Sequence, residues 1–247
     1  MSNQLDNSKK LGKLIGIGVG PGDPELITLK AYRLIQSAQV ICYLANVQGQ
    51  SQAKHIARAA FKKLKTEPLE IPVLMPMSQD RTIANKVYDK AADEIARQLE
   101  AGSDVIFLCE GDPLFFGSFA YLLERLEPQF ECQVVPGISS VHAASAALVE
   151  PLTQLKQSFA VVSGRHDDKH LVDTLNNHDT VVIMKAGLSR PRILKALIET
   201  DRTQDACYLE YIGRDNQSIL KDVTQLNFEA GPYFSLFVVR KQALKHS

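Results

Sequence analysis

The sequence has no long apolar run, no excess of charge of either sign and no closely spaced cysteine pair. Its apolar runs all fall short of the roughly 20 residues that a membrane span needs. Lysine plus arginine and aspartate plus glutamate both number 28, so the net charge is zero. No global field therefore attracts nucleic acid or an acidic membrane. We expect neither nucleic acid nor a membrane as a partner.

The cysteines indicate a reducing environment. Cys42, Cys109, Cys132 and Cys207 are far apart, and most of them lie in apolar, strand-like runs. This pattern is typical of buried, reduced thiols. The N-terminal residues 2–10 are polar without an apolar signal core, so we predict a loose arm there and a cytoplasmic protein.

Glycines are concentrated in one turn near the N-terminus. The segment Gly16 to Asp23 reads Gly-Ile-Gly-Val-Gly-Pro-Gly-Asp and follows a predicted first strand. Glycine allows the backbone to approach a ligand closely. The third glycine of a dinucleotide fingerprint is missing, however, because Pro21 or Asp23 takes its place, and no Lys-Ser or Lys-Thr follows as in a Walker loop. The turn therefore suits a ligand that is not an anion.

Strands and helices alternate through the first 150 residues. Apolar runs predict strands, and amphipathic stretches predict helices. We expect strands over 13–19, 39–43, 104–109 and 131–135, and helices over 28–38, 51–61, 80–101, 113–126 and 139–149. This alternation is typical of a mainly parallel sheet with helices on its faces.

The pattern changes after residue 150. We expect strands over 159–163, 180–184, 206–211, 218–223 and 233–241, and helices over 167–176 and 189–200. The last two strands follow each other without a helix, which favours a smaller α/β domain with antiparallel strands. The sequence thus predicts two α/β domains, 11–150 and 157–247.

Three loops of the first domain directly follow strands. They span 18–24, 111–118 and 136–140. In open α/β sheets, ligands bind beyond the carboxyl ends of the strands. We therefore expect these loops to gather at one edge of the sheet and to form a binding site.

The same loops carry a family resemblance. Residues 18–24 (Gly-Val-Gly-Pro-Gly-Asp-Pro) resemble the opening motif of the tetrapyrrole methylases, residues 111–118 their second motif and residues 134–140 their third. Similar features continue through 182–185 and 232–236, so five motifs stand in the family's order. The sequence is identified as a member of this family, whose enzymes use S-adenosylmethionine.

The resemblance implies a two-domain tetrapyrrole methylase-like fold, with S-adenosylmethionine bound in a cleft between the domains. This cofactor has a positive sulfonium and no phosphate, which matches a glycine turn with an aspartate and no basic residue. A homodimer is also implied. The resemblance assigns to cofactor binding Val19, Pro21, Asp112, Phe115, Ser118, Ser139, Ser140, Met184 and Ile212.

Within the family, residues 115–119 and 232–236 are most similar to the members that methylate carbon 20 of precorrin-2. That carbon must lose a proton after it accepts the methyl group, and a weak base nearby would help. The titratable candidates are Asp112, Lys185 and Tyr233. The acceptor could instead be another corrin carbon or uroporphyrinogen III, and the sequence does not show whether the substrate contains cobalt. An alternative outside the enzymes is a protein that binds these ligands without transferring a methyl group.

The candidate residues also have structural interpretations. Asp112 with the following proline is typical of the start of a helix, and Ser139 and Ser140 are suitable N-cap residues. Lys185 can be a solvated strand end, and Tyr233 can fill space at a strand edge.

Other polar residues are weighed in the same way. His166 and His170 stand four residues apart, but no third ligand lies at motif spacing, so we predict no metal site. Because the implied substrate bears several carboxylates, we expect cationic side chains around the cleft, from the set Lys54, Arg58, Arg165, Lys169 and Arg214.

Overall fold

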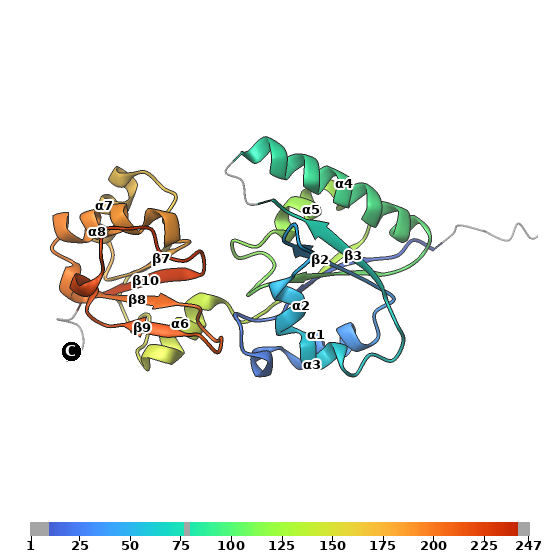
Figure 1. Cartoon of the computed structure of the whole chain (residues 1–247), viewed down its shortest axis with the longest axis horizontal. Coiled ribbons are helices and arrows are strands. Elements are labelled where there is room, and N and C mark those ends of the chain that lie inside the picture. Colours follow the sequence, from blue (N-terminus) through green and yellow to red (C-terminus); the bar gives the residue numbers. More distant parts are fainter. Residues whose placement is uncertain (1–9, 77–79, 242–247) are drawn as a thin grey trace, which may run out of the picture. The chain divides into compact units, whose positions relative to one another are not determined.

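The computed structural model describes residues 10–76 and 80–241, so the predicted arm lies outside the described residues except for Lys10. The chain divides into two compact units, one up to Ser139 and one from Ser140 (Figure 1). Each unit has its own sheet and its own core.

The first unit contains a parallel five-stranded sheet in the order β3-β2-β4-β1-β5. Its strands are β1 (Leu14–Gly18), β2 (Val40–Ala45), β3 (Leu69–Leu74), β4 (Val105–Cys109) and β5 (Cys132–Val135). Its helices are α1 (Leu29–Gln36), α2 (Gln52–Ile56), α3 (Arg58–Phe61), α4 (Arg81–Glu100) and α5 (Phe119–Leu126). The predicted alternation of strand and helix is confirmed.

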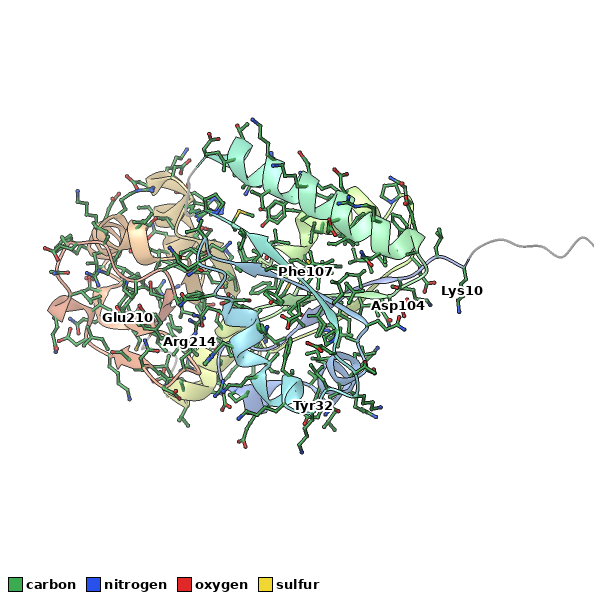
Figure 2. All side chains as sticks on the ribbon, turned by 45° about the vertical axis from the view of Figure 1, so that its right-hand side comes forward. Lys10, Tyr32, Asp104, Phe107, Glu210 and Arg214 are labelled. Atoms are coloured by element: carbon green, nitrogen blue, oxygen red, sulfur yellow. The ribbon has the colours of Figure 1, made fainter. Side chains whose placement is uncertain are left out.

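Helices cover both faces of this sheet because successive strand residues point to opposite sides. On β4, Phe107 (labelled in Figure 2) packs into the layer of α4 and α5, whereas its neighbours Ile106 and Leu108 pack into the layer of α1, α2 and α3. Strands buried on both faces are apolar throughout, as parallel strands usually are.

The second unit contains a mixed five-stranded sheet in the order β6-β7-β10-β8-β9. Its strands are β6 (Phe159–Ser163), β7 (Thr180–Met184), β8 (Ala206–Glu210), β9 (Ser218–Leu220) and β10 (Ser235–Arg240). Only β6 and β7 pair in parallel, so the predicted antiparallel strands are present. The helices α7 (Asp168–Asn177) and α8 (Arg190–Glu199) cover one face, and α6 (Ser140–Leu148) covers the other.

The units divide earlier than the predicted boundary. The expectation of a first domain over 11–150 placed α6 in that domain. Val141 and Leu148 of α6 instead pack with Val182 in the core of the second unit. Because α6 buries its apolar face there, the division falls after Ser139.

The helix predicted over 113–126 begins only at Phe119. Phe116 has a positive φ of 55°, a conformation that interrupts a right-handed helix. A Cβ on Gly117 would lie 2.3 Å from the carbonyl oxygen of Pro113, so the chain turns tightly there. Residues 113–118 therefore form a loop, and Asp112 does not cap α5.

Among the described residues, no helix combines the length and apolar character that crossing a membrane requires.

Candidate functional site

The loops that leave β1 and β4 are joined by backbone hydrogen bonds. The N–H of Val19 donates to the carbonyl of Cys109 (2.9 Å), and Gly20 and Gly111 exchange two further bonds, at 2.7 and 3.3 Å. Strand β1 lies between β4 and β5, so the carboxyl ends of all three strands are adjacent. This confirms that the three loops gather at one edge of the sheet.

Asp112 ties the third loop to the other two. One carboxylate oxygen accepts the N–H of Gly137 (3.0 Å), in the loop after β5, and the other accepts the N–H of Leu114 (2.9 Å). A Cβ on Gly137 would lie 2.1 Å from the carbonyl oxygen of Gly111, and a Cβ on Gly18 2.5 Å from that oxygen. Glycine at these two positions is thus required for the loops to pack against each other.

The side chains of this edge suit a ligand that is apolar and positively charged. Segments 18–27, 110–118 and 136–139 contain no lysine or arginine and carry four carboxylates. Five large apolar side chains of these segments are exposed: Leu26, Leu114, Phe115, Phe116 and Ile138. An edge of this kind lacks the basic groups with which proteins usually neutralise phosphate.

The structure places most of the predicted cofactor residues in these loops. The side chain of Val19 is fully buried in the core of the first unit, so its backbone is the part that can face a ligand. Ser139 is buried and Ser118 is half-buried. Pro21, Asp112 and Phe115 lie in the same set of loops, whereas Ser140 is the first residue of α6 in the second unit.

The remaining predicted residues share one edge of the second sheet. Strand β10 runs antiparallel to β7 and β8, and its first residues pair with their last ones. The segments at this edge therefore bring together Met184, Lys185, Ile212 and Tyr233. Tyr233 is 51% exposed. Lys185 has a positive φ of 55°, which is uncommon for a residue other than glycine and often marks a functional site.

An arginine and aromatic rings cluster at this second edge. Arg214, in the turn after β8 (labelled with Glu210 in Figure 2), lies with its guanidinium 3.7 Å from the ring centroid of Phe234. Tyr233 packs edge-on against the same ring, with centroids 5.0 Å apart. The N–H of Tyr211 donates to the carbonyl of Phe234 (2.8 Å) and fixes the turn beside it. Arginine on an aromatic face keeps its donors in a defined plane.

Two of the other predicted cations, Lys54 and Arg58, lie in the first unit. Lys54 forms an ion pair with Glu70 and also hydrogen bonds with Tyr43. Burial is the largest influence and lowers the pKa of Lys54, but the hydrogen bonds of its ammonium with Glu70 and Tyr43 and the charges of these groups together outweigh burial, so the pKa is raised. Arg58 donates to the carbonyl of His55 (3.1 Å). The charge of Lys54 is thus already balanced within the first unit.

The segment around α7 is exposed. Arg165 and Lys169 lie at its surface. The rings of His166 and His170 stack with centroids 4.1 Å apart. Within the described ranges, no group of three or more metal-binding side chains is found.

The family of tetrapyrrole (corrin/porphyrin) methylases has a model that matches residues 13–226. The chain belongs to the tetrapyrrole methylase family. The resemblance carried by the five motifs is therefore confirmed.

Relatives in this family differ in length and in named substrate. The chain is 36% identical to the cobalamin biosynthesis protein CobIJ of Mycobacterium tuberculosis over 94% of its own length, but it spans only 47% of that protein. It is 34% identical to a precorrin-2 C(20)-methyltransferase of Sinorhizobium sp, covering 93% of this chain and 95% of the relative. It is 28% identical to a cobalt-precorrin-2 C(20)-methyltransferase of Salmonella typhimurium, covering 94% and 97%.

Solved structures of tetrapyrrole methyltransferases share the fold. The uroporphyrin-III C-methyl transferase of Thermus thermophilus, complexed with S-adenyl homocysteine, aligns with a TM-score of 0.66 at 25% identity, over 93% of this chain and 98% of that one. A cobalt precorrin-4 methyltransferase aligns with a TM-score of 0.71 at 20% identity, over 92% and 94%. The predicted fold class, with a parallel first sheet and a mixed second sheet, is confirmed.

Proposed function

We propose that the chain is an S-adenosylmethionine-dependent methyltransferase that methylates carbon 20 of precorrin-2, or of its cobalt complex, in corrin synthesis. The observation that carries this proposal is the 34% identity to a precorrin-2 C(20)-methyltransferase across nearly the full length of both chains. The relative of Salmonella typhimurium, named for the cobalt form, supports the same carbon.

The first edge fits the methyl donor chemically. The donor supplies an electrophilic methyl group on a positive sulfonium, beside a neutral adenosine. The carboxylates and exposed apolar side chains of the three loops match that combination, and the lack of basic residues disfavours a nucleotide. The residues assigned to holding it in the first unit are Val19 (through its backbone), Pro21, Asp112, Phe115, Ser118 and Ser139; in the second unit they are Ser140, Met184 and Ile212.

The protein's main contribution is to hold donor and acceptor in line. Correct placement of two reactants is worth on the order of 7–11 kcal/mol of the barrier. The backbone bonds between Gly20 and Gly111 and the carboxylate of Asp112 make the loop edge rigid. Rigid loops of this kind place a bound ligand without a further ordering cost.

Removal of the proton from carbon 20 is assigned to Lys185 or Tyr233. The two residues share an edge of the second sheet, next to Met184. Asp112 is also titratable, but both of its oxygens already accept backbone N–H groups. Its main role is therefore to hold the loops together.

The test is incubation with labelled S-adenosylmethionine and precorrin-2, with and without cobalt, followed by mass and NMR location of the new methyl group. A methyl on carbon 20 is the expected result. A methyl on another carbon, or on uroporphyrinogen III alone, would reassign the substrate within the family. Binding of both ligands without transfer would indicate a sensor.

The proton acceptor is tested with single variants. We expect Lys185→Met or Tyr233→Phe to reduce turnover at least about 100-fold, the lower end of the range usual for general-base groups. Lys195→Met, an exposed position on α8, is the matched control and should leave turnover unchanged. Full activity in both site variants would refute the assignment.

A homodimer in the cytoplasm is part of the proposal. Light scattering coupled to size-exclusion chromatography should give twice the mass of one chain.

A further inference from the structure

A buried arginine lies beneath the segment that carries Tyr233 and Phe234. Arg190 is the first residue of α8, and it is only 8% exposed. Arginine is rarely buried to this extent unless its donors are satisfied. Such a buried guanidinium needs specific hydrogen-bond partners.

The guanidinium of Arg190 joins three parts of the second unit. Nε donates to the carbonyl of Glu229 (2.7 Å), and Nη2 donates to the side-chain oxygen of Asn227 (2.6 Å). Nη1 lies 4.0 Å from a carboxylate oxygen of Glu210, and the group stands 5.7 Å from the ring centroid of Tyr208. One planar group thus links α8, the segment before β10 and the end of β8.

Further hydrogen bonds hold the rest of that segment in place. The N–H of Gly231 donates to the carbonyl of Gly187 (2.9 Å), and the hydroxyl of Ser235 donates to the carbonyl of Pro232 (2.7 Å). A Cβ on Gly231 would lie 2.3 Å from the hydroxyl oxygen of Tyr208, so the backbone passes close to that hydroxyl group. Residues 227–232 therefore pack against the side chains of Arg190 and Tyr208.

We infer that Arg190 is a positioning residue that fixes segment 227–234 and so sets where Tyr233 and Phe234 stand at the edge of the second sheet. The catalytic consequence of this inference rests on the proposed function, whereas the positioning itself does not. Lysine cannot reproduce these two bonds, because its three donors share one nitrogen, whereas Nε and Nη2 of arginine are separate donors held in one rigid plane. The nearest carboxylate is too distant for a hydrogen bond, so the bonds to the segment are the main contacts of the guanidinium.

A purely structural role predicts a different outcome. If Arg190 only stabilised the unit, its loss would lower the free energy of unfolding but leave the segment in place while the protein stays folded. If Arg190 positions the segment, its loss loosens residues 227–234 in the folded protein. The two roles are separated by a local probe read well below the unfolding temperature.

The sequence offers such a probe because it contains no tryptophan. Tyr233→Trp places one fluorophore in the segment without background. In that variant we expect Arg190→Gln and Arg190→Lys to raise the acrylamide quenching constant about twofold and to lower the anisotropy, as for a locally opened segment. Arg192→Gln is the matched control, since Arg192 lies on the same helix but binds Asp168 and the carbonyl of His166 (both 2.7 Å).

Asn227→Ala is a second variant in case Arg190→Gln does not fold. Asn227 is exposed, and its loss removes one bond of the guanidinium and the bond that its Nδ2 donates to Glu229 (2.7 Å). It should move the fluorescence in the same direction by a smaller amount. An unchanged quenching constant in the Arg190 variants and in Asn227→Ala would overturn the inference.

Turnover is measured in the chain that keeps Tyr233. We expect Arg190→Gln to lower kcat about tenfold, in line with misplacement of a catalytic group, with Arg192→Gln unaffected. If the fluorescence responds while Tyr233→Phe and Arg190→Gln keep full turnover, the positioning stands and the proposed role of Tyr233 fails. If the fluorescence does not respond, the inference fails whatever the turnover.

Discussion

At the scale of single residues, Asp112 combines a family motif with a plain structural task. Its carboxylate accepts one N–H from its own loop and one from Gly137 in the neighbouring loop. We expect Asp112→Asn to lower the free energy of unfolding by about 1–3 kcal/mol, because an amide nitrogen cannot accept the N–H of Gly137. Urea denaturation measures this loss.

The control for this variant is Asp23→Asn. The side-chain carboxylate of Asp23 accepts the N–H of Glu25 (2.8 Å), within its own turn, so its replacement should cost less. Equal losses in both variants would contradict the idea that Asp112 holds two loops together.

Gly137 allows a sharper prediction about the same loops. A Cβ there would meet backbone atoms of both Gly111 and Gly18. We expect Gly137→Ala to cost about 1–3 kcal/mol or more of stability, since backbone cannot move aside as a side chain can. We also expect calorimetry to show weaker binding of S-adenosylmethionine. Unchanged stability and binding would show that the loops can separate freely.

The glycines also mark a limit of sequence reasoning at this scale. The sequence predicts close approach at the turn 16–23 but does not say to what. In the structure, the lack of a side chain at Gly18 and Gly137 allows the loops to pack against each other. The backbone that Gly18 meets belongs to Gly111 and Gly137, which are distant in the sequence, so no local pattern encodes the contact. By contrast, the N-cap of α1 depends on local sequence alone, because the hydroxyl oxygen of Thr28 accepts the N–H of Ala31, three residues on.

At the scale of elements, β3 is the strand that sequence reasoning missed. It is an edge strand, with Leu69 and Leu74 exposed and Pro72 in its middle. Proline is tolerated only where one side of a strand makes no ladder bonds, and Pro72 interrupts the apolar run 71–75 that would otherwise predict a strand. The buried strands β1, β4 and β7 were predicted within a residue or two because their apolar runs are complete.

Tyr43, Lys54 and Glu70 hold β3 to its neighbours. Glu70 of β3 accepts hydrogen bonds from Tyr43 of β2 and Lys54 of α2. Burial raises the pKa of Glu70, but these two bonds outweigh it and leave the pKa below 4.5. A lowered pKa in the folded state means that the stabilisation is present above the unfolded pKa and is lost as the pH falls through the folded one.

We therefore expect Glu70→Gln to reduce the acid dependence of stability. The variant should be less stable than the native chain by about 0.5–1 kcal/mol near neutral pH, because the pair is partly exposed. The difference should shrink as the pH falls below 4.5. Urea midpoints across this range measure the effect. Glu94→Gln, which removes an exposed ion pair with Arg97, is the control, and an equal pH response there would argue against a special role for Glu70.

At the scale of the whole molecule, the position of α6 decides where one unit ends. The sequence assigns residues 139–149 to a helix correctly but does not show which sheet it covers. Small residues of α6 such as Ala144 do not indicate which sheet they pack against. The chain passes from the first unit to the second just before this helix. The change of pattern near residue 150 reflects the end of α6 rather than the division between the units.

This assignment predicts how fragments behave. A fragment of residues 140–247 keeps α6 over Val182, Leu209 and Val238, whereas a fragment of 150–247 exposes that face of the sheet. We expect the longer fragment to unfold cooperatively on heating, as a unit with its own core should. We expect the shorter one to aggregate or to bind a dye for exposed apolar surface, because an uncovered sheet face is not stable in water.

Circular dichroism melting curves of the two fragments distinguish these outcomes. Leu148→Ala in the longer fragment is an intermediate case, since it removes one apolar contact of α6 and keeps the helix. Its melting temperature should lie between those of the intact fragment and of the one without α6. If the shorter fragment melts as cooperatively as the longer one, α6 contributes little to the second unit, and the division of the chain belongs near residue 150 after all.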